Sequence, residues 1–518
     1  MYERKYSILK KYFSTSDAEV EKEIFDKIYV TLSEINSIID FNSQTIRILV
    51  GNKGCGKSAI IEHILRTKCD EFEKSIRLEP NDFIVSDFPS GTSCAVIKNT
   101  VTPKIIRELC AKIGKEYKGL LSPEKNAMYI ASKEKEKMVS NELQKLKNLF
   151  DMFVKINLGE SVSFENELTD DDYINGLSAC LEAQNTKFYV LIDNIDQCSN
   201  TDTTGYFDII WGVIQAFSTI AKAIPNLRII ITVRADIWRR ISHSGSMNRA
   251  DVDKFRNCVK YVNPTREHIR EILRKRIEIC ANEIEQLPLY KKHNIMYMYS
   301  LLFEGKNCTI SEKNIDKKWE EYLVTSSRER PRDTVQLMNK LIEQAEARGA
   351  EKISSNDALS TLFVYSQERV DDIVNENHDR CPDLLKLINY FYDSNFEMPF
   401  NEVMNKLKIA AGINVKLNSV AMKNDYDSAL MLLDFLYQIE FLTARIVDNQ
   451  RREEYRYIRP YENPNLITGS FDLENYIWDI HPCYRAYLMS QYDRMKRMMV
   501  FSQSDSKKGK KAKRRVKR

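Results

Sequence analysis

Residues 51–58 hold the groups with the clearest chemical potential. They fit the pattern G-x-x-x-x-G-K-[ST] at every fixed position, and in order they are Gly51, Asn52, Lys53, Gly54, Cys55, Gly56, Lys57 and Ser58. In such a loop the backbone N–H groups point inward around phosphates, the lysine reaches the β- and γ-phosphates, and the hydroxyl ligates Mg²⁺. The pattern therefore predicts a phosphate-binding loop that runs into a helix from Ser58, with Ala59 as the next residue.

The segments on either side of the loop support this interpretation. Gln44–Val50 alternates and is rich in β-branched residues, like a buried strand, and residues 58–65 have apolar side chains at helical spacing. The order strand, loop, helix places bound phosphates at the N-terminus of a helix, which favours anions.

A second motif lies at residues 188–197, where five apolar residues precede Asp193. This is a Walker B pattern. A buried parallel strand places Asp193 beside the loop, where its carboxylate can hold Mg²⁺ through water together with Ser58. Asp196, three residues later, is a candidate for orienting an attacking water or accepting its proton.

Residues 227–233 predict another buried strand, which ends at Arg234. One helix, at about 204–223, separates it from the Walker B strand. Adjacent parallel strands joined by a crossover helix place Arg234 at the same sheet edge as Asp193, where it can sense the γ-phosphate. The alternative is a surface or helix-capping cation.

Residues 329–333 predict the start of another helix. Pro331 fixes the turn before it, and Arg332 at the helix start is a candidate to point at the phosphates from a lid; the alternative is a plain surface arginine.

Residues 399–408 and 428–439 resemble the two helices of a helix-turn-helix, and 441–447 with 453–458 predict the two strands of a wing. The stretch 424–444 has four acids and no lysine or arginine up to Ala444, so it repels DNA phosphates, and only Arg451 and Arg452 in the wing turn are basic. We therefore favour a winged helix that packs on protein over one that reads DNA. His481, before a proline, is interpreted as a core or turn residue rather than a nucleotide contact.

Composition limits the class of protein. The chain has 518 residues, enough for about three domains, and 43% hydrophobic residues. It has no apolar run of 18 residues and its N-terminus is charged, so we expect a cytoplasmic protein without a membrane span. The eleven cysteines are scattered, which argues against disulfides or a zinc site. Cys55 is interpreted as a tolerated small residue, with oxidation blocking the loop as the alternative.

Charge is concentrated at the C-terminus. Residues 507–518 carry nine positive and no negative charges, whereas the whole chain is +4, so the body is net acidic. Such a tail is suited to nucleic acid or anionic lipid without sequence reading. The alternative is a tail that only promotes solubility.

We expect five regions: a helical lead-in at 1–40, a P-loop core at 41–265, a helical lid at 266–357, a winged-helix domain at 358–500 and a basic tail at 501–518. Smaller elements are expected as follows: a helix over 18–39 that covers the nucleotide side, short strands at 75–79 and 83–87, and helices at about 98–116, 122–133 and 136–155.

With these motifs in this order, residues 20–495 resemble the AAA+-related STAND and origin-recognition-like P-loop ATPases, most closely bacterial members, several of which act in antiviral or other conflict systems. The resemblance implies an α/β fold, a P-loop NTPase parallel sheet with helices on both faces, then an α-helical lid and a winged helix. It implies an ATP- and Mg²⁺-dependent switch that ADP keeps folded and ATP opens for self-assembly. Onto this sequence it places the Walker roles at Lys57, Ser58, Asp193 and Asp196, the first sensor at Arg234, and the lid proline and second sensor at Pro331 and Arg332.

Two departures from the family limit what the resemblance implies. Asn194 stands where relatives carry a catalytic acid, which leaves the hydrolysis rate open. No sensor repeats follow the winged helix, so a sensor or effector is expected to be a separate protein. Arg239 and Arg240 are equal candidates for an arginine finger to a neighbouring subunit.

Three functions remain open at this point: an ATP-hydrolysing switch that binds ATP and ADP and assembles with itself or a partner, a DNA-binding or DNA-loading ATPase, and a nucleotide-binding scaffold with negligible turnover.

Overall fold

The computed structural model describes these residues: 2–14, 21–31, 35–41, 44–70, 72–83, 88–89, 91–116, 170–183, 185–198, 205–243, 252–285, 294–310, 315–448, 454–469 and 472–496. The chain divides into two compact units. One is Asp17–Pro264, here called the nucleotide unit, and the other joins Met1–Ser16 to Thr265–Arg518, here called the helical unit.

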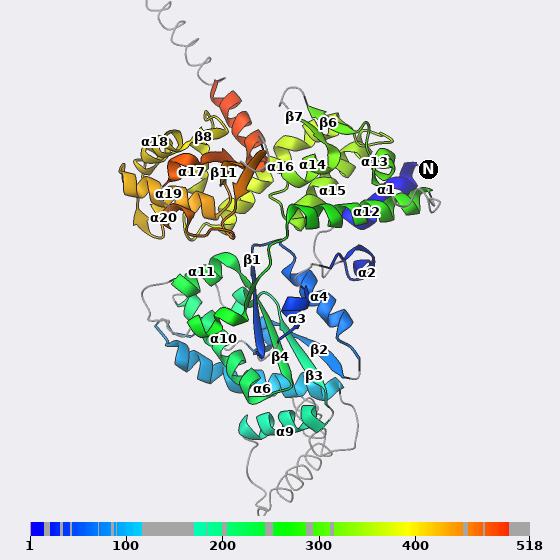
Figure 1. The fold of residues 1–518 in the computed structure, drawn as a ribbon, viewed down its shortest axis with the longest axis vertical. Coiled ribbons are helices and arrows are strands. Elements are labelled where there is room, and N and C mark those ends of the chain that lie inside the picture. Colours follow the sequence, from blue (N-terminus) through cyan, green and yellow to red (C-terminus); the bar gives the residue numbers. More distant parts are fainter. Residues whose placement is uncertain are drawn as a thin grey trace, which may run out of the picture. The chain divides into compact units, whose positions relative to one another are not determined.

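A five-stranded parallel sheet forms the centre of the nucleotide unit (Figure 1). Its strands are β1 (Ile46–Gly51), β2 (Glu73–Leu78), β3 (Lys187–Ile192), β4 (Leu227–Arg234) and β5 (Val259–Tyr261), in the order β2-β3-β4-β1-β5. All four neighbouring pairs are parallel. The loop strand β1 and the Walker B strand β3 are therefore both neighbours of β4, so their C-terminal ends share one edge.

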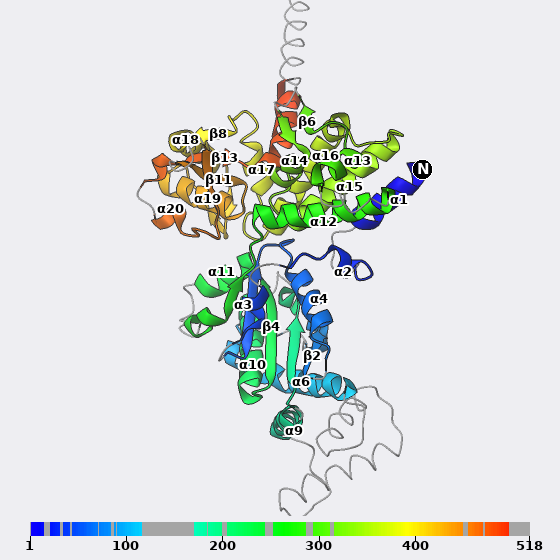
Figure 2. The ribbon, with the colours of Figure 1, turned by 45° about the vertical axis from the view of Figure 1, so that its right-hand side comes forward.

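Helices cover both faces of this sheet, as expected (Figure 2). On one face, α3 (Ile35–Ile39) and α4 (Lys57–Thr67) bury apolar side chains against alternate residues of the strands, among them Leu49 and Leu191. On the other face lie α6 (Cys94–Glu116), α9 (Asp170–Ala183), α10 (Tyr206–Ala223) and α11 (Ala235–His243). Strands buried on both faces explain the nearly continuous apolar runs in the sequence.

The N-terminal region differs from expectation. The continuous helix over 18–39 is wrong, because Tyr29 after the short helix α2 (Phe25–Ile28) is extended and α3 begins only at Ile35. A further helix, α1 (Tyr2–Phe13), belongs to the helical unit, where the Tyr6 hydroxyl donates to the carbonyl of Ala350.

The strand expected at 83–87 is wrong at Phe83, and its other residues lie outside the described residues. Phe83 ends a one-turn helix, α5 (Pro80–Phe83), because Pro80 suits the first position of a helix and buries its ring there. The helices expected at 122–133 and 136–155 lie outside the described residues.

The helical unit begins its second segment with α12 (Arg266–Glu285) and α13 (Ile295–Leu302), and continues with α14 (Trp319–Thr325), α15 (Pro331–Ala347) and α16 (Ser355–Glu376). The expectation of an all-helical region misses an antiparallel pair, β6 (Asn307–Ile310) and β7 (Ile315–Lys318). β7 has the sequence Ile-Asp-Lys-Lys, with no strand pattern of its own, and forms because it pairs with β6.

The winged helix has the two expected helices, α18 (Phe400–Ala411) and α19 (Tyr426–Gln438), and the two expected wing strands, β11 (Leu442–Asp448) and β12 (Glu454–Ile458). β13 (Ile477–Ile480) and β8 (Glu397–Pro399) complete an antiparallel sheet of order β12-β11-β13-β8. The smaller elements are α17 (Leu384–Asn389), α20 (Leu466–Gly469) and the pair β9 (Lys416–Leu417) and β10 (Val420–Ala421). Among the described helices, none is long and apolar enough to cross a membrane.

Candidate nucleotide-binding site

The phosphate-binding loop connects the end of β1 to the start of α4, as predicted. Gly54 and Gly56 adopt φ of +79° and +103°, a backbone region that costs other residues free energy. Gly51 is required for space instead, because a Cβ there would lie 2.8 Å from the carbonyl oxygen of Val262. The three glycines thus shape the loop for two different physical reasons.

Lys57 is buried, and its ammonium is held by the loop itself. Its Nζ donates to the carbonyl oxygens of Gly51 at 2.8 Å and Asn52 at 3.0 Å, and lies 3.9 Å from the Cys55 sulfur. The positive charge of Lys57 therefore lies within the phosphate-binding loop. Its hydrogen bonds are to backbone carbonyl oxygens, which phosphate oxygens can replace.

Asp193 follows β3 and is fully buried. Its Oδ1 accepts hydrogen bonds from the Thr232 hydroxyl and from the backbone N–H of Asn194 at 3.0 Å. Its Oδ2 is also buried and has no hydrogen-bond partner among the described residues. Thr232, on the neighbouring strand β4, was not predicted to belong to the site.

The chemistry of these residues fits Mg²⁺. Mg²⁺ prefers oxygen ligands, keeps several waters, and is usually bound by one or two protein oxygens together with substrate phosphates. The unsatisfied Oδ2 of Asp193 is a buried acceptor of this type, and the Ser58 hydroxyl lies in the first turn of α4. These two residues would hold the ion, which would neutralise phosphate charge.

Asn194 has a conformational role that sequence reasoning missed. Its φ is +53°, in the left-handed region, and its N–H also donates to the Thr232 hydroxyl at 3.0 Å. Asparagine tolerates this conformation better than glutamate does. Asparagine rather than an acid after Asp193 therefore coincides with a turn that favours asparagine.

Asp196 lies in the short 3₁₀ helix Ile195–Cys198. Burial raises the pKa of its carboxyl above the ordinary value, and the charges of Arg234 and Lys57 partly oppose that shift. The charges of Arg234 and Lys57 therefore both affect the pKa of Asp196, so these three predicted residues influence one another. A carboxylate of raised pKa is a stronger base, which suits the predicted role.

Arg234 is the last residue of β4 and lies opposite Gly51 in the register of the sheet. Its Nε and one terminal nitrogen donate to the two carboxylate oxygens of Asp236, both at 3.1 Å. The predicted placement at the edge near Asp193 is therefore found, with Asp236 as an additional partner. Arg240, a candidate finger, lies over the ring of Phe207 at 4.4 Å.

Pro331 and Arg332 are in the helical unit; the predicted helix begins here, and Pro331 is its first residue rather than part of the turn before it. Arg332 and the phosphate-binding loop belong to different units, and its sensor role stays a prediction. The residues just before them, Arg328 and Glu329, both adopt left-handed φ, of 46° and 52°. Two consecutive non-glycine residues in this region need strong local interactions to hold them.

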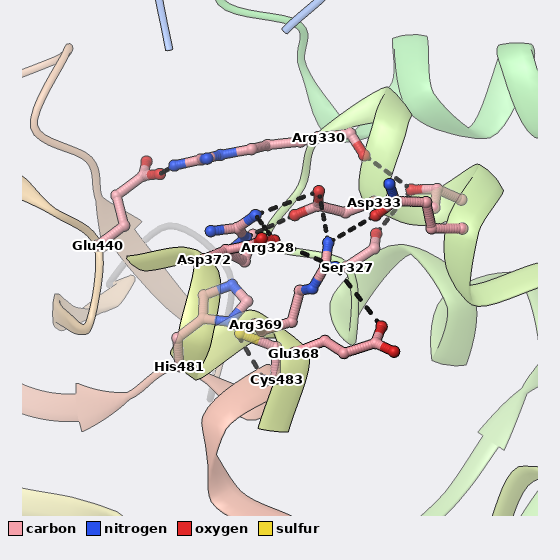
Figure 3. Close-up of polar contacts among 12 residues, drawn as sticks. Ser327, Arg328, Arg330, Asp333, Glu368, Arg369, Asp372, Glu440, His481 and Cys483 are labelled. Carbon is pink, nitrogen blue, oxygen red and sulfur yellow. Dashed lines mark hydrogen bonds and ion pairs between the residues drawn. The ribbon is translucent and has the colours of Figure 1, made fainter. Parts of the chain in front are cut away.

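Buried ion pairs supply those interactions (Figure 3). Arg328 donates to both carboxylate oxygens of Asp333, and Arg369 from α16 donates to Asp333 Oδ1 at 3.0 Å. Burial alone would raise the pKa of Asp333, but Arg328 and the other arginines outweigh burial and lower it.

The same segment is joined to the winged helix. Arg330 donates to Glu440, between α19 and β11, at 3.2 Å and lies 3.7 Å from Glu376 of α16. Glu329 accepts from Arg459, just after β12, and from Arg266 of α12 at 2.6 Å. The segment just before Arg332 therefore contacts both α12 and the winged helix.

His481 is a core residue, as expected. It is 2% exposed, its Nδ1 lies 3.2 Å from the Cys483 sulfur, and burial followed by nearby arginines holds its pKa well below the ordinary range. The basic wing residues Arg451 and Arg452 and the tail 507–518 lie outside the described residues.

Comparisons with known proteins agree with this division of the chain. Residues 21–233 match the model of the KAP family P-loop domain, and residues 267–374 match that of the FunZ-associated C-terminal helical domain. A search of the curated proteins gives no significant match.

Solved structures with a similar arrangement include the Aeropyrum pernix ORC2 protein in ADPNP–ADP complexes, with 10% identity, coverage of 93% of this chain and 94% of that one, and a TM-score of 0.39. CDC6P from Pyrobaculum aerophilum has 11% identity, coverage of 91% and 98%, and a TM-score of 0.32. The Aeropyrum pernix ORC1 protein in complex with DNA has 13% identity, coverage of 86% and 96%, and a TM-score of 0.31. The sequence matches thus describe a P-loop NTPase domain similar to the KAP family, followed by a helical domain similar to the FunZ-associated type.

Proposed function

We propose that this chain is a Mg-ATP-binding and slowly hydrolysing molecular switch. The observation that carries the proposal is the pairing of a complete phosphate-binding loop with Asp193, a buried acid whose Oδ2 has no hydrogen-bond partner among the described residues. A buried acceptor without a hydrogen bond costs free energy, and a hydrated Mg²⁺ would satisfy it.

Nucleotide binding would change the contacts of Lys57. Its ammonium would transfer from the carbonyls of Gly51 and Asn52 to the β- and γ-phosphates, where a charge-assisted bond is stronger. Arg234 would respond to the γ-phosphate by leaving Asp236. The difference between ATP and ADP is then read at the C-terminal edge of the sheet.

Hydrolysis would be slow because, among the described residues at this edge of the sheet, Asp196 alone is suited to act as the base. Asp196 has the raised pKa of a base, but the position after Asp193 carries Asn194 in a left-handed turn. Slow turnover suits a switch, because the ATP state then lasts long enough to act on a partner.

The helical unit would transmit the nucleotide state. If Arg332 contacts nucleotide, its displacement moves the segment before α15, and the bonds of Glu329 to Arg459 and of Arg330 to Glu440 carry that displacement to the winged helix. The output would be assembly with a second copy or with a separate protein. The role in bacterial antiviral defence implied by the resemblance stays a prediction.

The winged helix itself favours a protein partner. On α19, Tyr426 and Met431 are 48% and 54% exposed, and the helix is acidic. An apolar and acidic surface suits protein contact and repels DNA phosphates.

One combined experiment tests the switch. Particle mass is measured with ADP and with ATP, together with ATP turnover, for the full chain, Asp196→Ala and the exposed control Asp253→Ala. We expect ATP to change the mass and Asp196→Ala alone to lower turnover while nucleotide still binds. Nucleotide binding with neither turnover nor a mass change would support the scaffold alternative instead.

A DNA-binding ATPase is the second candidate, favoured by the nine positive charges of residues 507–518. Deleting them should then remove most DNA affinity, and that affinity should fall steeply with salt. Equal binding after truncation would assign DNA contact to another region, and no binding by the full chain would remove this candidate.

A further inference from the structure

Arg77 lies beside the carboxylate of Asp193, the proposed ligand of Mg²⁺. It is on the outer strand β2, in register with Leu191 of β3, so Asp193 is two residues further along the neighbouring strand. A terminal nitrogen of Arg77 is 3.6 Å from Asp193 Oδ2, and the two side chains are 16% and 1% exposed. Long side chains reach such a diagonal neighbour in a sheet.

This contact uses the oxygen that other groups leave unsatisfied. Thr232 and the Asn194 N–H occupy Oδ1 of Asp193, whereas Arg77 is the cation that faces Oδ2. A buried carboxylate without an opposite charge is costly, and the guanidinium reduces that cost. At 3.6 Å the contact is an ion pair without a hydrogen bond, so a cation with better geometry can replace it.

A second acid holds Arg77 from its other side. Its Nε lies 2.8 Å from Oε1 of Glu79, whose side chain is 51% exposed. Lys112 of α6 fixes the backbone at this point by donating to the Arg77 carbonyl at 3.0 Å. The guanidinium thus lies between two carboxylates on a fixed backbone, and it can move towards Glu79 when Mg²⁺ takes its place at Asp193.

We propose that Arg77 is a positioning residue for the metal-binding carboxylate: it neutralises Asp193 before Mg²⁺ arrives and competes with Mg²⁺ for Oδ2. This inference rests on the proposed Mg-ATP site. Because the guanidinium and Mg²⁺ repel each other, Arg77 raises the concentration of Mg²⁺ that the site requires. Glu79 opposes Arg77 by drawing the guanidinium away.

The test measures binding of a fluorescent ATP analogue across a range of Mg²⁺ concentrations. Arg77→Gln should lower the Mg²⁺ concentration for half-maximal binding by about three- to tenfold, a size expected for removing one nearby charge. Arg77→Lys should stay close to the unmodified chain. Arg107→Gln, which removes an exposed arginine from the same unit, should change nothing.

A second variant should change the Mg²⁺ requirement in the opposite direction. It keeps the test valid even if Arg77→Gln does not fold. Glu79→Gln changes an exposed residue and should raise the Mg²⁺ requirement by about twofold. Unchanged Mg²⁺ dependence in Glu79→Gln, or in a folded Arg77→Gln, overturns the role of Arg77. If the unmodified chain shows no Mg²⁺-dependent nucleotide binding, the proposed function itself is wrong.

Discussion

The guanidinium of Arg330 donates to the carboxylate of Glu440 at 3.2 Å, although 110 residues separate them in the chain. Arg330 is the N-cap of α15, and Glu440 lies in the turn between α19 and β11. Both are buried, so neither charge can be satisfied by bulk water. The pair joins the start of the helix that carries Arg332 to the winged helix.

Replacing Arg330 should destabilise the helical unit strongly. Arg330→Met removes an ion-pair partner from the buried Glu440 and from the partly exposed Glu376, and breaking a buried pair typically costs about 3–5 kcal/mol. Denaturant unfolding should show this loss, whereas Arg332→Met, which is not part of this pair, should cost much less. In the double variant Arg330→Met/Glu440→Leu much of the loss should be recovered, because the buried carboxylate that lost Arg330 is removed as well. Equal stability of Arg330→Met and the unmodified chain would contradict a structural role for the pair.

The helical unit should lose stability in acid through Asp333. Its pKa is lower in the folded state than in the unfolded chain, because Arg328 and Arg369 outweigh the effect of burial. The stabilisation is therefore fully present above the unfolded pKa of about 3.9 and is lost as the pH falls through the lower, folded pKa. Unfolding measured from pH 6 to pH 2 should show this loss, and Asp333→Asn should be less stable at neutral pH with a flatter acid profile. If the stability of Asp333→Asn falls with pH in the same way as that of the unmodified chain, Asp333 is not the group responsible for the loss in acid.

ATP turnover should rise with pH through a pKa above the usual range of an aspartate. Burial raises the pKa of Asp196, and only the deprotonated carboxylate can accept a proton from water. The pH–rate profile of the full chain should therefore have a rising limb that Asp196→Asn lacks. If the rising limb persists in Asp196→Asn, another group supplies the base.

The turn at Asn194 should tolerate glycine better than alanine. With φ at +53°, a left-handed residue that has a Cβ costs roughly 1–2 kcal/mol, and asparagine reduces this cost through local hydrogen bonding. Thermal unfolding of the nucleotide unit should place Asn194→Gly near the unmodified chain and Asn194→Ala below it. The same ranking implies that Asn194→Glu does not restore fast hydrolysis, because glutamate disturbs the turn. Rapid turnover in Asn194→Glu would show that Asn194 alone limits the rate.

The motifs of the nucleotide unit were predictable because local patterns determine them. Glycine spacing, β-branched runs and an acid at a strand end place Lys57, Asp193 and Arg234 at one sheet edge without knowledge of the tertiary contacts. The wing strands and both helices before them were predictable for the same reason.

What could not be predicted depends on partners distant in the sequence. The contacts of Arg77 and Thr232 come from neighbouring strands, and Arg330 meets Glu440 although 110 residues separate them. A run of charges such as residues 328–333 normally indicates a solvated surface, so its burial has no sequence signal. The strand β7 was missed because pairing with β6, not its own residue preference, makes it extended.

The most direct test of the account is equilibrium binding of ATP to the full chain with Mg²⁺, compared with the variant Lys57→Ala. Because Lys57 supplies the charge at the loop, we expect saturable binding by the full chain and a loss of at least about tenfold in affinity in Lys57→Ala. Folding of the variant is checked by its thermal unfolding without nucleotide. No binding by the full chain, or equal binding by a folded Lys57→Ala, would show that residues 51–58 do not hold the phosphates of ATP.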